Sequence, residues 1–223
     1  MSGWFYRCKY RPSTPSLLPL RNLDYDPYDP LSRTYLALMR CIAASDVTIS
    51  LAAAWWRYYD PAMNDVDLQK IRSAAESVFR CSHGSCHGFG HWRNVEDSFL
   101  LIAEANGADR LVGRLFAILH DCCREDDGAD PLHGPRAATL IREWSDRLSL
   151  SPVQEDMLVF AVHHHTDGET SQDPTVGACW DADRLDLGRV GIIPVPRYMS
   201  TSTGREIARL GSIYLYREQK VRP

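Results

Sequence analysis

Apolar residues recur every three or four positions over most of the chain, which is the period of a helix with one buried face. No segment alternates apolar and polar residues as a half-buried strand would. The helical pattern covers residues 33–58, 91–105, 109–120, 135–148, 151–165, 173–187 and 203–216, and residues 60–79 supply a turn followed by a further helix. The sequence therefore predicts an all-α fold.

Residues typical of helix ends stand at the edges of these segments. Asn106-Gly107 predicts the C-terminal end of the helix that begins near residue 91. The stretch "SPVQ" at 151–154 resembles a capping box with proline at the first helical position, and Asp173-Pro174 repeats that device. Pro135 predicts the start of a further helix, and "TGREIARLGSIYLY" is interpreted as one final helix.

The composition changes along the chain. Residues 1–32 are rich in Pro, Tyr, Asp and Arg and have no period, which predicts an extended arm. We therefore expect residues 1–64 to form an arm and helices that pack on a helical metal-binding domain of residues 65–223. This first part is expected either to cover the pocket or to contribute to a homodimer.

Charge and cysteine usage exclude some classes of protein. The formal net charge is −4, from 25 basic and 29 acidic residues, so nothing indicates a nucleic-acid partner. No apolar run approaches the roughly 20 residues that cross a bilayer, and the stretch "MSGWFYRCKYRPSTPSLLPL" lacks the continuous apolar segment typical of a signal peptide. Seven cysteines, two of them adjacent, fit a reducing cytoplasm better than a disulfide framework.

Residues that bind metals gather on the apolar faces of the predicted helices. His91 precedes Val95 by one turn, His120 follows Phe116 by one turn, and Asp183 follows Cys179 by one turn. A carboxylate on an apolar face is costly unless it is paired or bound to a metal. Imidazole and carboxylate together suit Mn, Fe, Co, Ni or Zn, and carboxylates with water also suit Mg. The helices are therefore expected to direct these ligands to a metal in the core.

The stretches "GHWRNV", "LHD" and "DADRLD", in this order, resemble the HD-domain superfamily of metal-dependent phosphohydrolases, defined by the pattern His…His-Asp…Asp. The resemblance covers residues 80–200 and implies an HD-type helical bundle. It implies that the metal ligands are His91, His120, Asp121 and Asp183.

Members of that superfamily with two metals add histidines between the pair and the last aspartate. Here His133 and the triplet at 163–165 occupy those places, and the resemblance implies His133, His164 and His165 as further ligands. The triplet leaves open which of its members bind, although "HTDG" favours His165 and then His164. A cofactor of one or two divalent ions follows.

The implied activity is hydrolysis of a small phosphorylated metabolite, above all a nucleotide, by a metal-activated water. Asp121, Arg124 and Glu125 are the expected catalytic residues, with Glu125 as proton carrier or as partner of a ligand. Guanidinium groups match phosphate, so the expected substrate-binding residues are His87, Arg124, Arg136 and Arg184. Asp186, one turn after Asp183, is expected to orient a ligand imidazole.

Two departures and two alternatives limit this interpretation. Arg124 stands where stringent-response nucleotide hydrolases of the superfamily have a glutamate, and "GYP" of the cyclic-dinucleotide phosphodiesterases is missing after "HHHTDG". Neither substrate is therefore transferred to this chain. The alternatives are a di-iron oxygenase with the same ligand set and a non-catalytic protein that senses a nucleotide.

Overall fold

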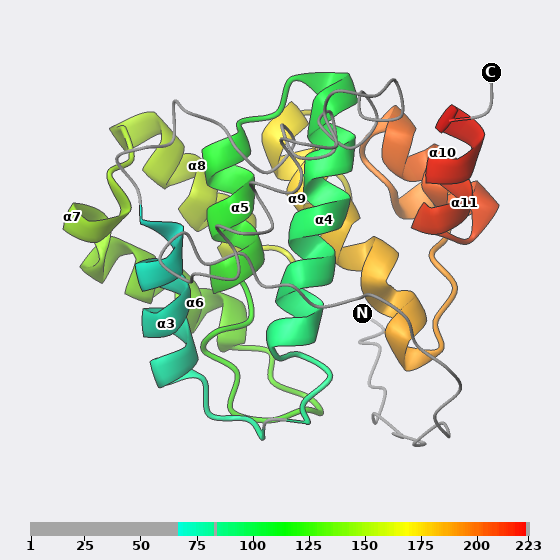
Figure 1. Cartoon of the computed structure of the whole chain (residues 1–223). Coiled ribbons are helices and arrows are strands. Elements are labelled where there is room, and N and C mark those ends of the chain that lie inside the picture. The colour runs from blue at the N-terminus through cyan, green and yellow to red at the C-terminus, as the bar shows by residue number, and fades with distance from the viewer. Residues whose placement is uncertain (1–66, 83, 222–223) are drawn as a thin grey trace, which may run out of the picture. The chain divides into compact units, whose positions relative to one another are not determined.

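The computed structural model describes residues 67–82 and 84–221, and these residues form helices and no strands (Figure 1). The all-α prediction is thereby confirmed for this part of the chain, whereas the expected arm and helices of residues 1–64 lie outside the described residues. The elements are α3 (Leu68–Val78), α4 (Phe89–Asn106), α5 (Arg110–Leu119), α6 (His133–Glu143), α7 (Ser145–Leu148), α8 (Pro152–His163), α9 (Pro174–Leu185), η3 (Asp186–Val190), η4 (Pro196–Tyr198), α10 (Ser202–Leu210) and α11 (Ile213–Val221).

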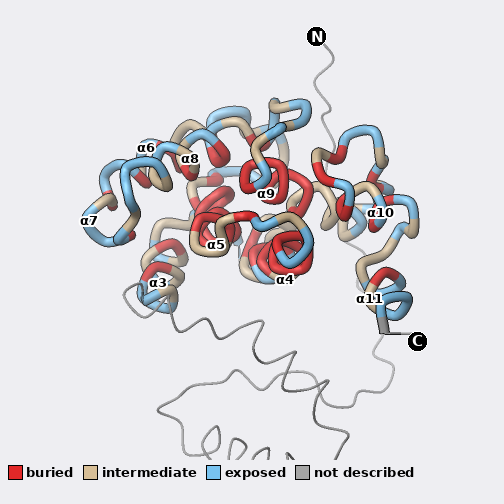
Figure 2. Tube along the Cα trace, turned by 90° about the horizontal axis from the view of Figure 1, so that it is seen from above, coloured by how far each residue is buried: buried red, intermediate tan, exposed pale blue. Residues whose placement is uncertain are grey.

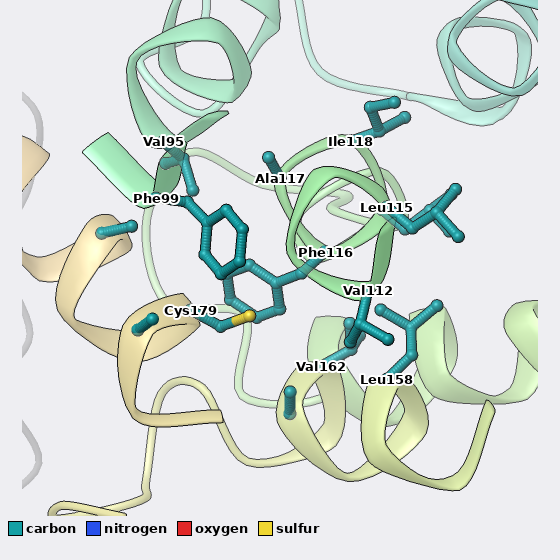
Figure 3. Packing of buried hydrophobic residues seen from close by; sticks show 14 of the residues in the cluster. Val95, Phe99, Val112, Leu115, Phe116, Ala117, Ile118, Leu158, Val162 and Cys179 are labelled. Atoms are coloured by element: carbon teal, nitrogen blue, oxygen red, sulfur yellow. The ribbon is translucent and has the colours of Figure 1, made fainter. Parts of the chain in front are cut away.

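Helices α4, α5 and α9 form the centre of the described domain, and Figure 2 shows that buried residues concentrate on them. Their facing sides carry Phe99, Phe116 and Cys179, whose side chains meet between the three helices (Figure 3). Helix α8 packs on α5 and α6. Burial of each large apolar side chain of this kind stabilises the fold by about 1.5–3 kcal/mol.

The close packing of α4 on α5 depends on Gly113. A β-carbon at this position would lie 1.9 Å from Cζ of Phe99, so any larger residue would force the ring or the helix to move. Glu96 joins the same helices through charge, because its carboxylate accepts from Arg72 of α3 at 2.8 Å and from Arg114 of α5 at 2.6 Å. Apolar packing and the buried carboxylate of Glu96 therefore both hold these helices together.

Several predicted helix ends are confirmed. Gly107 ends α4 with φ of 70°, a left-handed conformation that glycine adopts without strain. Ser151 and Gln154 form the expected capping box before α8, and Pro152 occupies the first position. Asp173 accepts hydrogen bonds from the amides of Thr175 and Val176 at the start of α9.

Two predicted boundaries were wrong. The helix expected from Pro135 begins at His133 and is interrupted at Trp144, where a separate turn, α7, follows. The final helix is in fact two, because Gly211 takes φ of 70° and ends α10 before α11 begins. Among the described residues, no helix is both long and apolar enough to cross a membrane.

Candidate metal centre

Four side chains from three helices meet at one point. His91 lies in the first turn of α4, and His120 ends α5; their Nε2 atoms lie 3.0 Å apart. Oδ1 of Asp183, near the end of α9, lies 3.2 Å from Nε2 of His91 and 3.8 Å from Nε2 of His120. Oδ2 of Asp121 lies 3.7 Å from each of the same two nitrogens. These atoms could all contact a single cation between them.

A second group adjoins the first on the other oxygen of Asp121. Oδ1 of this carboxylate lies 3.1 Å from Nε2 of His133 and 3.5 Å from Nε2 of His165. The two imidazole Nε2 atoms are themselves 2.8 Å apart. Asp121 therefore stands between two pairs of histidines, with one oxygen toward each pair, and both groups have the composition of a metal site.

Gly134 allows the second pair to form. A β-carbon at Gly134 would lie 2.8 Å from the carbonyl oxygen of Val162 and 2.9 Å from that of His163. The start of α6 can therefore approach the end of α8 closely only with glycine here. His133 begins α6 and His165 follows α8, so this approach brings their rings together.

Hydrogen bonds on the far side of each ring determine which nitrogen faces the centre with a lone pair. A carbonyl oxygen only accepts, so a ring nitrogen bonded to it carries the proton. Nδ1 of His120 donates to Phe116 O at 3.1 Å, Nδ1 of His165 donates to Val162 O at 2.7 Å, and Nδ1 of His133 donates to Asp130 O. Nδ1 of His91 lies 2.7 Å from Oδ2 of Asp186. Each neutral ring therefore directs the lone pair of Nε2 at the centre.

Four imidazole lone pairs and two carboxylates facing one another repel unless positive charge lies between them. Burial lowers the pKa of His120 to about 3, so this ring stays neutral, as a metal ligand must. Burial alone would also lower the pKa of His91, but hydrogen bonds to Asp183 and Asp186 raise it. The carboxylates thus favour positive charge at this point, and a divalent cation supplies it without a proton. The donor set fits a metal.

The carboxylates respond to the same surroundings. Burial alone would raise the pKa of Asp121, but its interactions with the surrounding imidazoles of His120, His133, His165 and His87 lower it well below its ordinary value. The pKa of Asp183 is likewise lowered, since its close contact with His91 and the nearby imidazoles of His120 and His165 outweigh its burial. Both groups are therefore ionised and able to bind a cation.

The structure does not bring His164 into this centre. Its side chain is 39% exposed, and its Nδ1 lies 3.3 Å from Oδ1 of Asp167. Helix α8 ends at His163, and the backbone turns at His164, so adjacent histidines of the triplet point in different directions. His165 alone, of the three, turns inward and is buried.

Two predicted substrate arginines are engaged elsewhere. Arg136 donates to the carbonyl of Cys123 through Nε at 3.1 Å and Nη2 at 2.9 Å, and also pairs with Asp130. Arg184 donates to the carbonyl oxygens of Glu169 and Tyr198, each at 2.7 Å. Both guanidinium groups tie loops together, and among the described residues neither forms a hydrogen bond or ion pair with the four histidines and two aspartates of the centre. Their expected role as phosphate clamps stays a prediction.

The residues after the His-Asp pair are divided between the centre and the surface. Arg124 is buried and donates from Nε to Oδ1 of Asp121 at 3.3 Å. Glu125 faces the other way, half exposed, with Oε1 3.0 Å from Nη1 of Arg80. The geometry therefore keeps Arg124 as a candidate at the centre and gives Glu125 no contact with a ligand.

His87 and Asp186 lie against the ligands. Nδ1 of His87 is 2.9 Å from Oδ2 of Asp121, and Trp92 holds the loop by donating to the carbonyl of His87 at 2.8 Å. Asp186 holds His91, as predicted, and in turn accepts from Nδ2 of Asn94 at 2.9 Å. Such outer contacts orient metal-binding imidazoles.

The sequence analysis missed Arg189. This residue lies on η3, and its guanidinium lies 3.4 Å from Nδ1 of His87. The short helical turn after Asp183 has no apolar period from which to read a direction. The only sequence signal was the position of an arginine six residues beyond a predicted ligand.

Comparison with known proteins supports the fold. No protein-family model matches the sequence, and a search of curated proteins also finds no match. Among solved structures, the chain is similar to a predicted HD superfamily hydrolase from an uncultured Thermotogales bacterium. The likeness has a TM-score of 0.54 and 20% sequence identity, over 70% of this chain and 90% of that protein. The chain therefore shares the helical fold of that protein, which is the fold that the resemblance predicted.

Proposed function

We propose that this protein is a metal-dependent hydrolase of phosphoric esters, acting on a small phosphorylated metabolite and above all a nucleotide. One observation carries the proposal: Asp121 lies between the imidazole pairs His91–His120 and His133–His165, all buried. The similar solved structure, itself described as a predicted hydrolase, supports the same class. The nucleotide rests on the resemblance to the superfamily.

The six proposed ligands form two groups, each of which would hold one divalent ion. His91, His120, Asp121 and Asp183 would hold a first divalent ion, and His133, His165 and the second oxygen of Asp121 a second one. When bound, such ions lower the pKa of a coordinated water toward about 7 and neutralise charge on phosphoryl oxygens. The Nδ1 bonds to fixed acceptors keep each ring in place, so the site is preorganised.

Arg124 supplies positive charge at the edge of this centre. Its Nε contacts Oδ1 of Asp121, and its Nη1 donates to the carbonyl of Asp126 at 3.3 Å. A guanidinium in this position orients the bridging carboxylate and adds a donor for an anionic substrate.

The test combines metal analysis with a phosphate-release screen over nucleotides, sugar phosphates and aryl phosphates, in Mn, Co, Ni, Zn or Mg. Asp121→Asn should lose bound metal and turnover together. Asp167→Asn is the matched control, because this carboxylate is 73% exposed and touches only His164 among the described contacts. Hydrolysis at the wild-type rate by Asp121→Asn would refute the proposal.

Assays of the iron-loaded protein with and without oxygen distinguish the proposed hydrolase from the oxygenase alternative. Phosphate release that is equal with and without oxygen supports hydrolysis. An oxidised product that forms only in air, while no ester releases phosphate, would contradict the proposed hydrolase and favour the oxygenase. Binding of nucleotides without any product would favour a sensing role.

A further inference from the structure

Arg189 is held in place by backbone on both sides. Its Nε donates to the carbonyl of Cys86 at 2.6 Å, and its Nη1 donates to the carbonyl of Asp186 at 3.1 Å. These bonds join the loop before α4 to the turn after α9. The guanidinium plane is thereby fixed beside His87, and the side chain is 17% exposed.

Within the described part of the chain, the remaining nitrogen of Arg189 has no good acceptor. Its Nη2 faces Nδ1 of His87 at 3.4 Å, while the same Nδ1 lies only 2.9 Å from Oδ2 of Asp121. A ring nitrogen that donates to a carboxylate cannot also accept from a guanidinium, and guanidinium nitrogens only donate. Nδ1 of His87 therefore donates to the nearer, charged oxygen of Asp121. Nη2 of Arg189 faces this donor and keeps N–H groups that can donate to a ligand.

The position of this nitrogen relates it to the metal centre. Nη2 and Oδ2 of Asp121, the carboxylate shared by both proposed metal subsites, contact the same nitrogen of His87. A fixed, partly exposed guanidinium with a free edge fits an oxygen of an anionic group, and planar forks of this kind are well suited to phosphate.

We propose that Arg189 is a substrate-binding residue whose Nη2 donates to an oxygen of the phosphoryl group beside the metal centre. This inference rests on the proposed function for the identity of the anion. Of the four arginines considered, Arg136 and Arg184 are committed to backbone carbonyls, and Arg124 bonds to Asp121 itself. Arg189 therefore takes the role that the sequence analysis assigned to Arg136 and Arg184.

The experiment compares Arg189→Met with wild type, both loaded with manganese. Titration calorimetry measures the dissociation constant of inorganic phosphate, and p-nitrophenyl phosphate measures KM and kcat. We expect Arg189→Met to raise the phosphate dissociation constant and KM about tenfold, the effect of losing one charged hydrogen bond. Arg142→Met is the matched control, since Arg142 is 48% exposed and pairs with Glu155 and Asp156. It should change neither constant.

A structural role must be separated from direct binding. If Arg189 acted only by orienting His87, its effect would disappear in a His87→Gln background, and the proposal would be overturned. Arg189→Lys retains the charge but cannot form both backbone bonds. Arg189→Lys should keep more phosphate affinity than Arg189→Met. An equal loss of affinity in the two variants would indicate a merely structural role and overturn the assignment. The same conclusion holds if Arg189→Met also binds less metal.

The outcomes also distinguish this inference from the proposed function. Phosphate binding that Arg189→Met weakens, without hydrolysis of any ester by wild type, leaves the assignment intact and refutes the function. Hydrolysis by wild type with unchanged constants in Arg189→Met refutes the assignment and leaves the function intact. Failure of wild type to bind phosphate refutes the assignment.

Discussion

Oδ2 of Asp186 lies 2.7 Å from Nδ1 of His91, so a carboxylate on the turn after α9 orients an imidazole in the first turn of α4. The two residues are far apart in the sequence, and the contact fixes which nitrogen of His91 faces the centre. An outer carboxylate of this kind also makes the imidazole a stronger ligand.

Replacement of Asp186 by alanine should therefore weaken metal binding without removing a ligand. We expect the affinity for the first metal to fall by about 10- to 100-fold, the usual effect of losing such a partner. Competition with a chromophoric chelator measures this affinity. Asp167→Ala serves as control, and equal affinities in the two variants would show that Asp186 has no part in binding.

His133 and His164 should differ although both were predicted as ligands. His133→Ala removes a nitrogen that lies 3.1 Å from Oδ1 of Asp121, so the second metal should be lost and the first retained. His164→Ala alters only a partly exposed ring beside Asp167 and should leave both metals bound. Elemental analysis of the two purified variants gives the stoichiometry. Loss of metal from His164→Ala would contradict the geometry.

Gly134→Val should separate α6 from α8. The added side chain would meet the carbonyl oxygens of Val162 and His163, which are backbone atoms and cannot turn aside. We expect loss of the second metal together with a decrease in stability of about 1–3 kcal/mol, typical of overpacking. Gly90→Val provides the control, because a β-carbon there meets no atom of the described residues within 4 Å. Unchanged metal content in Gly134→Val would show that this approach is not required.

Glu96→Ala should destabilise the domain without changing the metal site. It leaves Arg72 and Arg114, whose side chains are 19% and 17% exposed, without their shared carboxylate. Breaking a buried pair costs about 3–5 kcal/mol, and partial exposure of the arginines places the expected loss near the lower end. Urea unfolding of metal-loaded protein measures it. A midpoint equal to that of wild type would mean that the ion cluster contributes nothing to stability.

Much of the fold could be predicted from local signals. Helix positions follow from the apolar period, and the ends at Gly107, Ser151 and Asp173 follow from residues that satisfy free amides or adopt a left-handed turn. The errors arose where a short-range signal had two interpretations. Pro135 fits the third position of a helix as well as the first, and Gly211 is tolerated inside a helix or ends one.

The site was predictable where the ligand lies inside a periodic helix. His91, His120 and Asp183 stand on apolar faces, and the structure brings them together with Asp121. The choice within the histidine triplet was not predictable from periodicity, because α8 ends at His163 and the direction of each later side chain depends on the turn. The same limit applies to Arg136 and Arg184, since nothing local reveals the carbonyl groups that bind them.

The sequence by itself determined the helices, the residue types of the candidate metal ligands and the faces of the helices that carry them, because these depend on contacts a few residues apart. Only the tertiary structure decided that Asp121 serves two histidine pairs, that His165 rather than His164 turns inward, and that Arg189 faces the centre through His87. These relationships join helix ends and turns that lie far apart in the chain. Their geometry is set by how closely neighbouring helices can approach, as at Gly113 and Gly134.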